Sequence, residues 1–273
     1  MPVIEPGRTN ATDAVAAWFD ALEARHLANL RPAEVGRALR ALSSAYVERR
    51  DRLARGAALD GAGKRAAFAL YYGPVHFVVV RAIARALEAA APPIDLVADL
   101  GCGTGVAGAA WALECDPRAR IVGIERHPWA ADEARWTCRA LGLDADIRCG
   151  DLARVRLPAR ASAVVAAFTA NELSEEVRAA LLRELLAAHA RGARALVIEP
   201  IAKSAAPWWP GWAAAVRAAG GREDEWRFAA ELPGIAARLG RAAGLDPREL
   251  TARSLYLGSQ LLAASGGGAQ ARR

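Results

Sequence analysis

The chain has 273 residues, of which 53% are hydrophobic and 24% charged, so it has the material for a sizeable core and is not expected to be disordered. It contains no charge-free run of 18 apolar residues, and its N-terminus lacks a basic segment followed by a long apolar one, so we expect neither a membrane span nor a secretory signal. The formal net charge of +6 leaves open solvated arginine-rich helix faces or a basic groove for RNA, and the alternation of arginines with acids favours the first.

The four cysteines contain no C-x-x-C pair. We expect all of them in the core of a sheet domain and the protein in the reducing cytoplasm, and we expect no zinc or iron–sulfur site. They are Cys102, Cys115, Cys138 and Cys149.

The first 91 residues are predicted to form an all-helical N-terminal extension, because apolar residues recur there at helical spacing. The third helix is interrupted at Gly73–Pro74, within the stretch Y-Y-G-P-V-H-F. A bend there could bring the hydroxyl of Tyr72 or the imidazole of His76 over a ligand; the alternative is a kinked core helix that uses these rings for packing. We predict a loose arm over residues 1–10, helices over about 12–30, 32–55 and 64–90, and a flexible connection over 56–63.

The stretch Val97–Gly108, V-A-D-L-G-C-G-T-G-V-A-G, has the order strand, glycine turn and helix. An apolar run ends in Asp99, glycines follow at 101, 103 and 105, and helix-compatible residues come next. An α/β sheet uses this arrangement to present backbone N–H groups and a positive helix end to a ligand. A side chain at the glycines would block the turn or the approach of the ligand.

Strand-like and helix-like segments then alternate, which predicts an α/β domain with a mostly parallel sheet over about residues 92–264. After the fifth strand the pattern is looser, and residues 265–273 are predicted to be a disordered tail. We predict strands over 94–100, 120–125, 145–149, 161–168, 193–199, 226–229 and 251–257, helices over 104–114, 128–141, 174–190 and 232–243, a short helix ending near 219, and a polar turn over 220–225.

Acidic residues stand at the ends of three successive predicted strands, where open α/β sheets bind ligands. Glu125 could accept hydrogen bonds from both ribose hydroxyls of a nucleoside, and Asp151 from an adenine amino group. Asp99 could orient the glycine turn or meet an amino group of the ligand. The alternatives are a surface acid at 125, a turn-forming aspartate at 151 and a loop-bracing hydrogen bond at 99.

The order D-L-G-C-G-T-G resembles motif I of the class I S-adenosylmethionine-dependent methyltransferases. Gly103, Gly105 and Gly108 also match G-x-G-x-x-G, the dinucleotide fingerprint, but that match begins too late in the turn, so a nicotinamide or flavin site is the weaker alternative. The methyltransferase resemblance covers about residues 94–200. It implies a Rossmann-like, seven-stranded sheet flanked by helices, with one antiparallel strand, and an enzyme that uses S-adenosylmethionine.

The resemblance also implies cofactor-binding residues. The glycine turn would hold the methionine end of the cofactor, Glu125 the ribose and Asp151 the adenine. The full candidate set is Asp99, Gly101, Cys102, Gly103, Gly105, Glu125, Arg126, Asp151 and Leu152.

The acceptor side is less defined. After the fourth strand the chain has F-T-A-N-E-L, not the D/N-P-P-Y motif found in many enzymes of this family that methylate amines of bases or glutamine. Asn171 and Glu172 could face the acceptor, or could only cap the next helix. An amine acceptor needs only to lose a proton, whereas a hydroxyl would need a base. With His76 and Tyr72, these two residues are the candidate catalytic residues.

A narrower resemblance is carried by Y-Y-G-P-V-H-F, T-A-N-E-L-S-E-E and L-V-I-E-P. These stretches are similar to methyltransferase-like proteins of small ribosomal subunit assembly in mitochondria and to their bacterial relatives. Those mitochondrial proteins have downstream cysteines that bind a metal cluster, and this chain has none after Cys149. We therefore expect a methyltransferase acting on a small molecule or protein, without a metal, and keep RNA or ribosome binding as the alternative.

Overall fold

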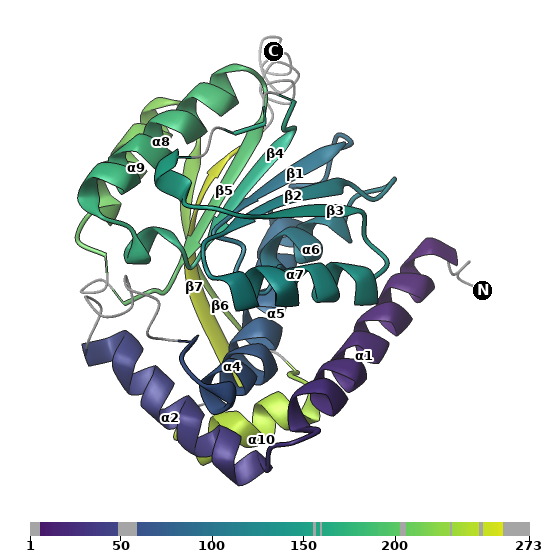
Figure 1. The fold of residues 1–273 in the computed structure, drawn as a ribbon. Coiled ribbons are helices and arrows are strands. Elements are labelled where there is room, and N and C mark those ends of the chain that lie inside the picture. Colours follow the sequence, from purple (N-terminus) through teal and green to yellow (C-terminus); the bar gives the residue numbers. More distant parts are fainter. Residues whose placement is uncertain are drawn as a thin grey trace, which may run out of the picture.

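Seven strands form one sheet at the centre of the computed structural model, which describes residues 6–48, 59–154, 157–158, 160–202, 206–229, 231–245 and 248–258 (Figure 1). The strands are β1 Leu96–Leu100, β2 Arg120–Glu125, β3 Ala145–Cys149, β4 Ala163–Ala167, β5 Arg194–Glu199, β6 Arg222–Ala229 and β7 Glu249–Leu257. Their order is β3-β2-β1-β4-β5-β7-β6, and β7 runs antiparallel to both β5 and β6. The predicted mostly parallel seven-stranded fold is confirmed.

The inner strands consist mostly of apolar residues because helices cover both faces of the sheet. One face is covered by α5 (Gly73–Ala86), α6 (Val106–Ala112) and α7 (Pro128–Ala140), and the other by α8 (Glu175–Ala190) and α9 (Trp209–Ala218). As expected, α8 begins after Ser174, whose hydroxyl accepts a hydrogen bond from the backbone N–H of Val177.

Two corrections concern the edges of the sheet. The predicted polar turn over residues 220–225 is wrong for residues 222–225, because Arg222–Glu225 are the first half of β6; the turn itself is at Gly220. This edge strand pairs only with β7, so its charged side chains stay in water while the backbone is paired. At the opposite edge, Cys149 ends β3 and is exposed, whereas the other three cysteines are buried as expected; all four are free thiols.

The N-terminal region is helical, with different boundaries from those predicted. Helix α1 covers Pro6–Leu27, so the predicted loose arm is wrong for residues 6–10, and residues 1–5 lie outside the described residues. Helix α2 covers Pro32–Glu48; its predicted end near residue 55 and residues 56–58 of the predicted connection also lie outside them. The described part of that connection is shorter than predicted, because α4 begins at Ala62.

The predicted break at Gly73–Pro74 is wrong. Helix α4 (Ala62–Ala67), a π-helical turn over Phe68–Tyr72 (the π turn) and α5 form one continuous helix. Pro74 is tolerated because it lies in the first turn of α5. By length and composition alone the helix Ala62–Ala86 could cross a membrane, but core helices of globular proteins pass the same test, and 61% of its most apolar window is buried.

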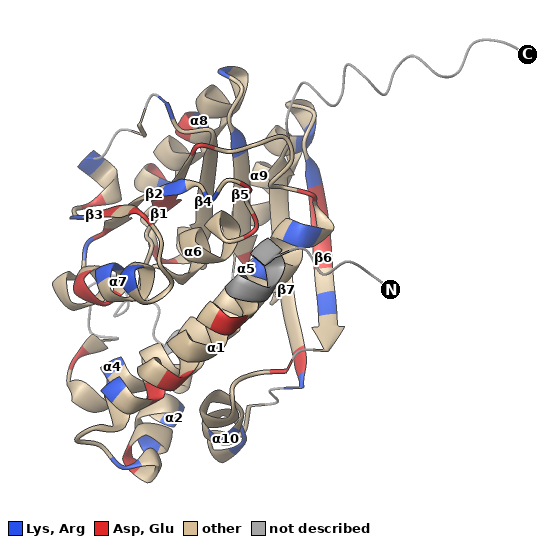
Figure 2. Cartoon of the chain, turned by 90° about the vertical axis from the view of Figure 1, so that its right-hand side faces the viewer, with Lys and Arg blue, Asp and Glu red and all other residues tan. Residues whose placement is uncertain are grey.

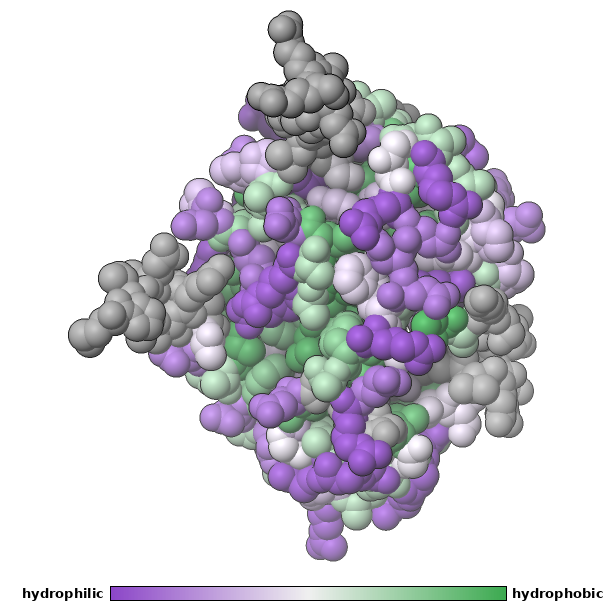
Figure 3. Space-filling view, turned by 180° about the vertical axis from the view of Figure 1, so that it is seen from behind, coloured by the Kyte–Doolittle hydropathy of each residue, from purple (hydrophilic) through white to green (hydrophobic). Residues whose placement is uncertain are grey.

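Helix α10 (Gly234–Ala242) lies between β6 and β7 in sequence and beside the N-terminal helices in space (Figure 1). Arg40 of α2 donates a hydrogen bond to the carbonyl of Ala242, and Arg238 pairs with Glu23 of α1 at 3.1 Å. The large core therefore runs from the sheet through α5 into α1, α2 and α10. Figure 3 shows hydrophobic residues reaching the surface in the middle of the rear face.

Candidate functional site

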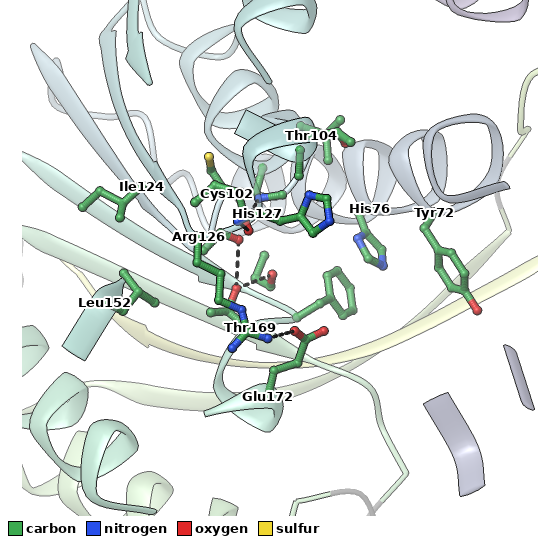
Figure 4. Close-up of a pocket in the computed structure, with 18 of the residues that line it drawn as sticks. Tyr72, His76, Cys102, Thr104, Ile124, Arg126, His127, Leu152, Thr169 and Glu172 are labelled. Carbon is green, nitrogen blue, oxygen red and sulfur yellow. Dashed lines mark hydrogen bonds and ion pairs between the residues drawn. The ribbon is translucent and has the colours of Figure 1, made fainter. Parts of the chain in front are cut away.

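A cavity of about 290 Å³ lies at the carboxyl ends of the central strands, between the glycine turn and the π turn (Figure 4). Its walls come from both the sheet domain and the N-terminal helices. Among the described residues, no group of three or more His, Cys, Asp or Glu side chains is arranged to hold a metal. The lining residues used below are Phe68, Tyr72, His76, Gly101, Cys102, Gly103, Thr104, Glu125, Arg126, His127, Asp151, Leu152, Phe168, Thr169, Asn171, Glu172 and Glu199.

The glycine turn requires glycine for two different reasons. Gly101 has φ +67°, and a Cβ there would lie 2.4 Å from Cγ2 of Thr169. Gly105 has φ +79° and precedes α6, where a Cβ would lie 3.0 Å from Ala134 of α7. Gly103 lines the cavity, so its backbone is open to a ligand, whereas Gly105 serves helix packing and does not line it.

Asp99 braces this turn from beneath. Its carboxylate is buried and accepts a hydrogen bond of 2.7 Å from the backbone N–H of Gly108 in α6. Burial raises the pKa of this carboxyl to about 7. Asp99 does not line the cavity, so the structure places it at the loop-bracing position that the sequence left open.

Glu125 connects the end of β2 to the glycine turn. One carboxylate oxygen accepts a hydrogen bond from the backbone N–H of Gly103 at 3.0 Å, and the other accepts one from the N–H of His127 at 2.8 Å. Asp151 is exposed at the cavity rim and accepts a hydrogen bond from the N–H of Ala153. Both residues line the cavity, and each carboxylate oxygen can accept a further hydrogen bond; Cys102, Arg126 and Leu152 also line it.

These groups fit an adenosine-containing ligand. An open glycine backbone, a carboxylate at the end of β2 and another after β3 surround one continuous cavity. Their spacing along the sheet follows the arrangement that α/β folds use for nucleosides.

The opposite wall of the cavity is aromatic. The ring of His76 stacks on Phe168 with centroids 3.8 Å apart, and Tyr72 lies 5.7 Å from His76 and 5.8 Å from Phe68. Burial lowers the pKa of His76 to about 3 and raises the pKa of Tyr72. At neutral pH both candidate catalytic residues are therefore uncharged, and the imidazole is a poor proton acceptor.

The other two candidate catalytic residues differ in how they are held. Glu172 lines the cavity with a carboxylate oxygen 3.8 Å from a guanidinium nitrogen of Arg126. Burial raises the pKa of Glu172 to about 7. Asn171 is held on both sides, because its amide donates to Glu199 at 2.7 Å and its carbonyl accepts from the indole of Trp208 at 3.0 Å.

Sequence reasoning missed Glu199. This buried residue ends β5, lines the cavity and also accepts a hydrogen bond from the backbone N–H of Asn171 at 3.3 Å. Burial raises its pKa to about 8. The signal was present, because Glu199 follows an apolar strand and precedes Pro200, just as Glu125 ends the second strand.

Other lining residues were missed as well, namely Phe68, His127, Phe168 and Thr169. Phe168 and Thr169 begin the stretch F-T-A-N-E-L, but no motif distinguishes Phe68 or His127 in the sequence. All four reach the cavity through the packing of the π turn and the loops after β2 and β4. Trp209 and Trp212 are buried in the second core beneath α9, so they form no wall of the cavity.

Residues 97–192 match the family model described as a methyltransferase domain. No curated protein matches the chain.

Among solved structures, the chain is similar to the mitomycin 7-O-methyltransferase MmcR, at 18% identity over 93% of this chain and 69% of that one, with a TM-score of 0.49. It is similar to the plantazolicin methyltransferase BpumL in complex with a triazolic desmethylPZN analog and SAH, at 12% identity over 82% and 97% of the two chains, with a TM-score of 0.49. It is similar to the N-methyltransferase NodS from Bradyrhizobium japonicum WM9, at 11% identity over 67% and 88%, with a TM-score of 0.44. Similarity at this level does not identify the acceptor of this chain.

Proposed function

Because this chain belongs to the class I S-adenosylmethionine-dependent methyltransferases, we propose that it methylates a small molecule enclosed with the methyl donor in one cavity. The observation that carries the proposal is the closure of that cavity by the π turn. Phe68, Tyr72 and His76 come from the N-terminal helices and line the same cavity as the glycine turn. Figure 4 shows Tyr72 and His76 in this position. A wall of this kind leaves room for a compact acceptor and shields it from water on that side.

The residues of the chain have distinct parts in this reaction. Gly101, Gly103, Glu125 and Asp151 would hold S-adenosylmethionine, which supplies an electrophilic methyl group. The aromatic wall would orient the acceptor against it. Positioning of two reactants in this way can lower a barrier by roughly 7–11 kcal/mol.

Charge distribution supports a small-molecule acceptor over RNA. The described lining residues include four acids, Glu125, Asp151, Glu172 and Glu199, and a single cation, Arg126. On the face drawn in Figure 2, basic and acidic residues are interspersed along the helices and form no continuous basic stripe. An RNA backbone would instead favour a basic surface beside the cleft.

Titration calorimetry with S-adenosylmethionine and S-adenosylhomocysteine tests the donor half of the proposal. Gly103→Arg should abolish the heat of binding, because the side chain would project from the open turn. Gly192→Arg is the matched control, since that glycine also has positive φ but nothing lies within 4 Å of its Cβ position. Glu125→Ala should weaken binding by about 1–3 kcal/mol. Unchanged affinity in Gly103→Arg would contradict the assignment of the turn.

Methylation with radiolabelled donor tests the acceptor half. After incubation with fractionated cell extract, we expect label in the small-molecule fraction. Label found only in protein or only in RNA would refute a small-molecule acceptor while leaving the donor site intact.

A further inference from the structure

The acceptor half of the cavity combines aromatic rings with a carboxylate. Phe68, Tyr72, His76 and Phe168 form a continuous wall in which neighbouring ring centroids are 3.8–6.5 Å apart. Figure 4 shows His76, Tyr72 and Glu172 around the same part of the cavity. Aromatic faces attract cations, and the attraction increases where water is excluded.

The charges around this space favour a positive ligand over a negative one. Arg126 is paired with Glu172, whose carboxylate oxygen lies 3.8 Å from a guanidinium nitrogen. Asp151 adds a negative charge at the rim, and Glu199 adds a buried carboxyl group. His76 contributes none, because burial keeps its imidazole neutral. A carboxylate or phosphate acceptor would find no unbalanced cation among the described lining residues.

Building on the proposed small-molecule function, we propose that the acceptor is an amine, bound as its ammonium ion between Glu172 and the aromatic wall, and that Glu172 takes its proton. Phe68, Tyr72 and Phe168 supply the aromatic faces. Arg126 holds the carboxylate at the cavity edge.

Glu172 has the acidity that this role requires. Burial raises the pKa of its carboxyl to about 7, with Arg126 opposing the rise and Glu125 adding to it. A base with a pKa near the working pH is both ionised often enough and basic enough to act.

The proton balance is simple. The ammonium ion gives one proton to the Glu172 carboxylate and becomes a neutral amine with a free lone pair. That lone pair forms the new C–N bond to the donor methyl group while the C–S bond breaks and its electron pair stays on sulfur. The methylated ammonium product leaves with the positive charge, and the Glu172 carboxyl returns its proton to water.

The test uses the protein loaded with S-adenosylhomocysteine, so that binding is measured without turnover. Three probes share one ring and differ in charge: benzylamine, benzyl alcohol and benzoate. We expect calorimetry to give benzylamine at least a tenfold advantage over both others. Glu172→Gln should weaken the binding of benzylamine about tenfold, which is the scale of a lost charged hydrogen bond. It should leave the affinity for benzyl alcohol unchanged. Glu176→Gln, at an exposed position in the first turn of α8, is the matched control and should change neither.

The pH dependence of benzylamine binding separates the effect of the Glu172 charge from the effect of the pocket's shape. A carboxylate is charged above its pKa, so benzylamine binding should strengthen about tenfold between pH 6 and pH 8 in the wild type and stay flat in Glu172→Gln. Glu125 and Arg126 interact electrostatically with Glu172, and Glu172 does so with Glu199. The other titratable residues that line the cavity are Tyr72, His76, Cys102, His127 and Asp151. The same profile in Glu199→Gln shows whether Glu199 contributes.

The outcomes are distinguishable. Equal affinity for the three probes, or a preference for benzoate or benzyl alcohol, overturns the amine proposal and leaves a small-molecule pocket standing. Failure of all three to bind a protein that still binds S-adenosylhomocysteine counts against both proposals. If Glu172→Gln binds benzylamine as tightly as the wild type, Glu172 does not bind the ammonium ion. Retained binding of S-adenosylhomocysteine shows that the variant is folded.

Discussion

At the scale of single residues, Gly101 is the least replaceable position in the turn. It combines a positive φ of +67° with a Cβ position only 2.4 Å from Thr169 Cγ2 and 2.7 Å from its Oγ1. Thr169 Oγ1 in turn donates a hydrogen bond to the carbonyl of Gly101 at 3.1 Å. This hydrogen bond and the close packing hold the loops after β1 and β4 together where both line the cavity.

Gly101→Ala should destabilise the protein by about 2–4 kcal/mol, because backbone strain and overpacking add. Gly192 has φ +96° and open space around its Cβ position, so Gly192→Ala introduces backbone strain without a clash. It should reduce the free energy of unfolding by only about 1–2 kcal/mol. Chemical denaturation measures both. The double variant Gly101→Ala/Thr169→Ala should recover part of the loss, and an additive result in this cycle would contradict a direct clash.

At the scale of elements, α1 is fastened to α7 by a buried carboxylate. Glu133 of α7 is 1% exposed and accepts hydrogen bonds from His26 at 2.7 Å and Arg25 at 3.2 Å, both in α1. Arg25 also lies over the ring of Trp136, 5.0 Å from its centroid. Because α7 follows β2 and Glu125, this contact ties the N-terminal helices to the cofactor side of the cavity.

Glu133→Gln should reduce the free energy of unfolding by about 1.5–3 kcal/mol, the range for hydrogen bonds to a charged group. The exposed pair Glu23–Arg238, between α1 and α10, provides the control, and Glu23→Gln should change stability by less than about 1 kcal/mol. Hydrogen exchange should be faster in α1 of Glu133→Gln than in α1 of Glu23→Gln. Equal protection of α1 in the two variants would show that the buried carboxylate does not fasten it.

The π turn is the second element with a specific consequence. Its wider winding holds Phe68 and Tyr72 at the cavity within an otherwise continuous helix, while Ala69 and Leu70 enter the core. Such turns within helices are frequent at functional sites. The contacts of α1, α2 and α10 with this part of the chain make the acceptor wall depend on the whole N-terminal region.

At the scale of the whole molecule, one core joins the N-terminal helices and the sheet. Trp18, Leu39 and Leu42 belong to the same buried cluster as Val97 and Ile121 of the central strands. The separate domains predicted for residues 1–91 and 92–264 therefore share their hydrophobic interior.

We expect calorimetry of the full chain to show a single unfolding transition whose van't Hoff and calorimetric enthalpies agree. A chain that begins at Leu59 should lose this cooperative transition, because the partners of α1 and α2 become exposed. Two resolved transitions in the full chain would instead establish independently folding domains. Removal of residues 259–273, most of which belong to the predicted tail, is the control and should leave the transition unchanged.

The sequence alone determined the parts of the protein that depend on local order. The glycine turn with Asp99, the strand-ending position of Glu125 and the alternation of apolar segments follow from neighbours in the chain, and they were enough to predict the fold and the cofactor. Most of the predicted cofactor-binding residues line the cavity, whereas Asp99 and Gly105 do not. Helix α8 and its N-cap Ser174 were also predicted from local sequence order.

Only the tertiary structure decided the acceptor side. Glu199, Phe168 and Phe68 come from three distant segments, and no spacing in the sequence relates them. The charged residues Arg222–Glu225 looked like a turn in the sequence. They form a strand because an edge strand can carry charged side chains that face water. The break expected at Gly73–Pro74 is a continuous helix because the π turn and the first turn of α5 accommodate both residues. The pKa values of His76 and Glu172 depend on burial, which is a property of packing and not of sequence order.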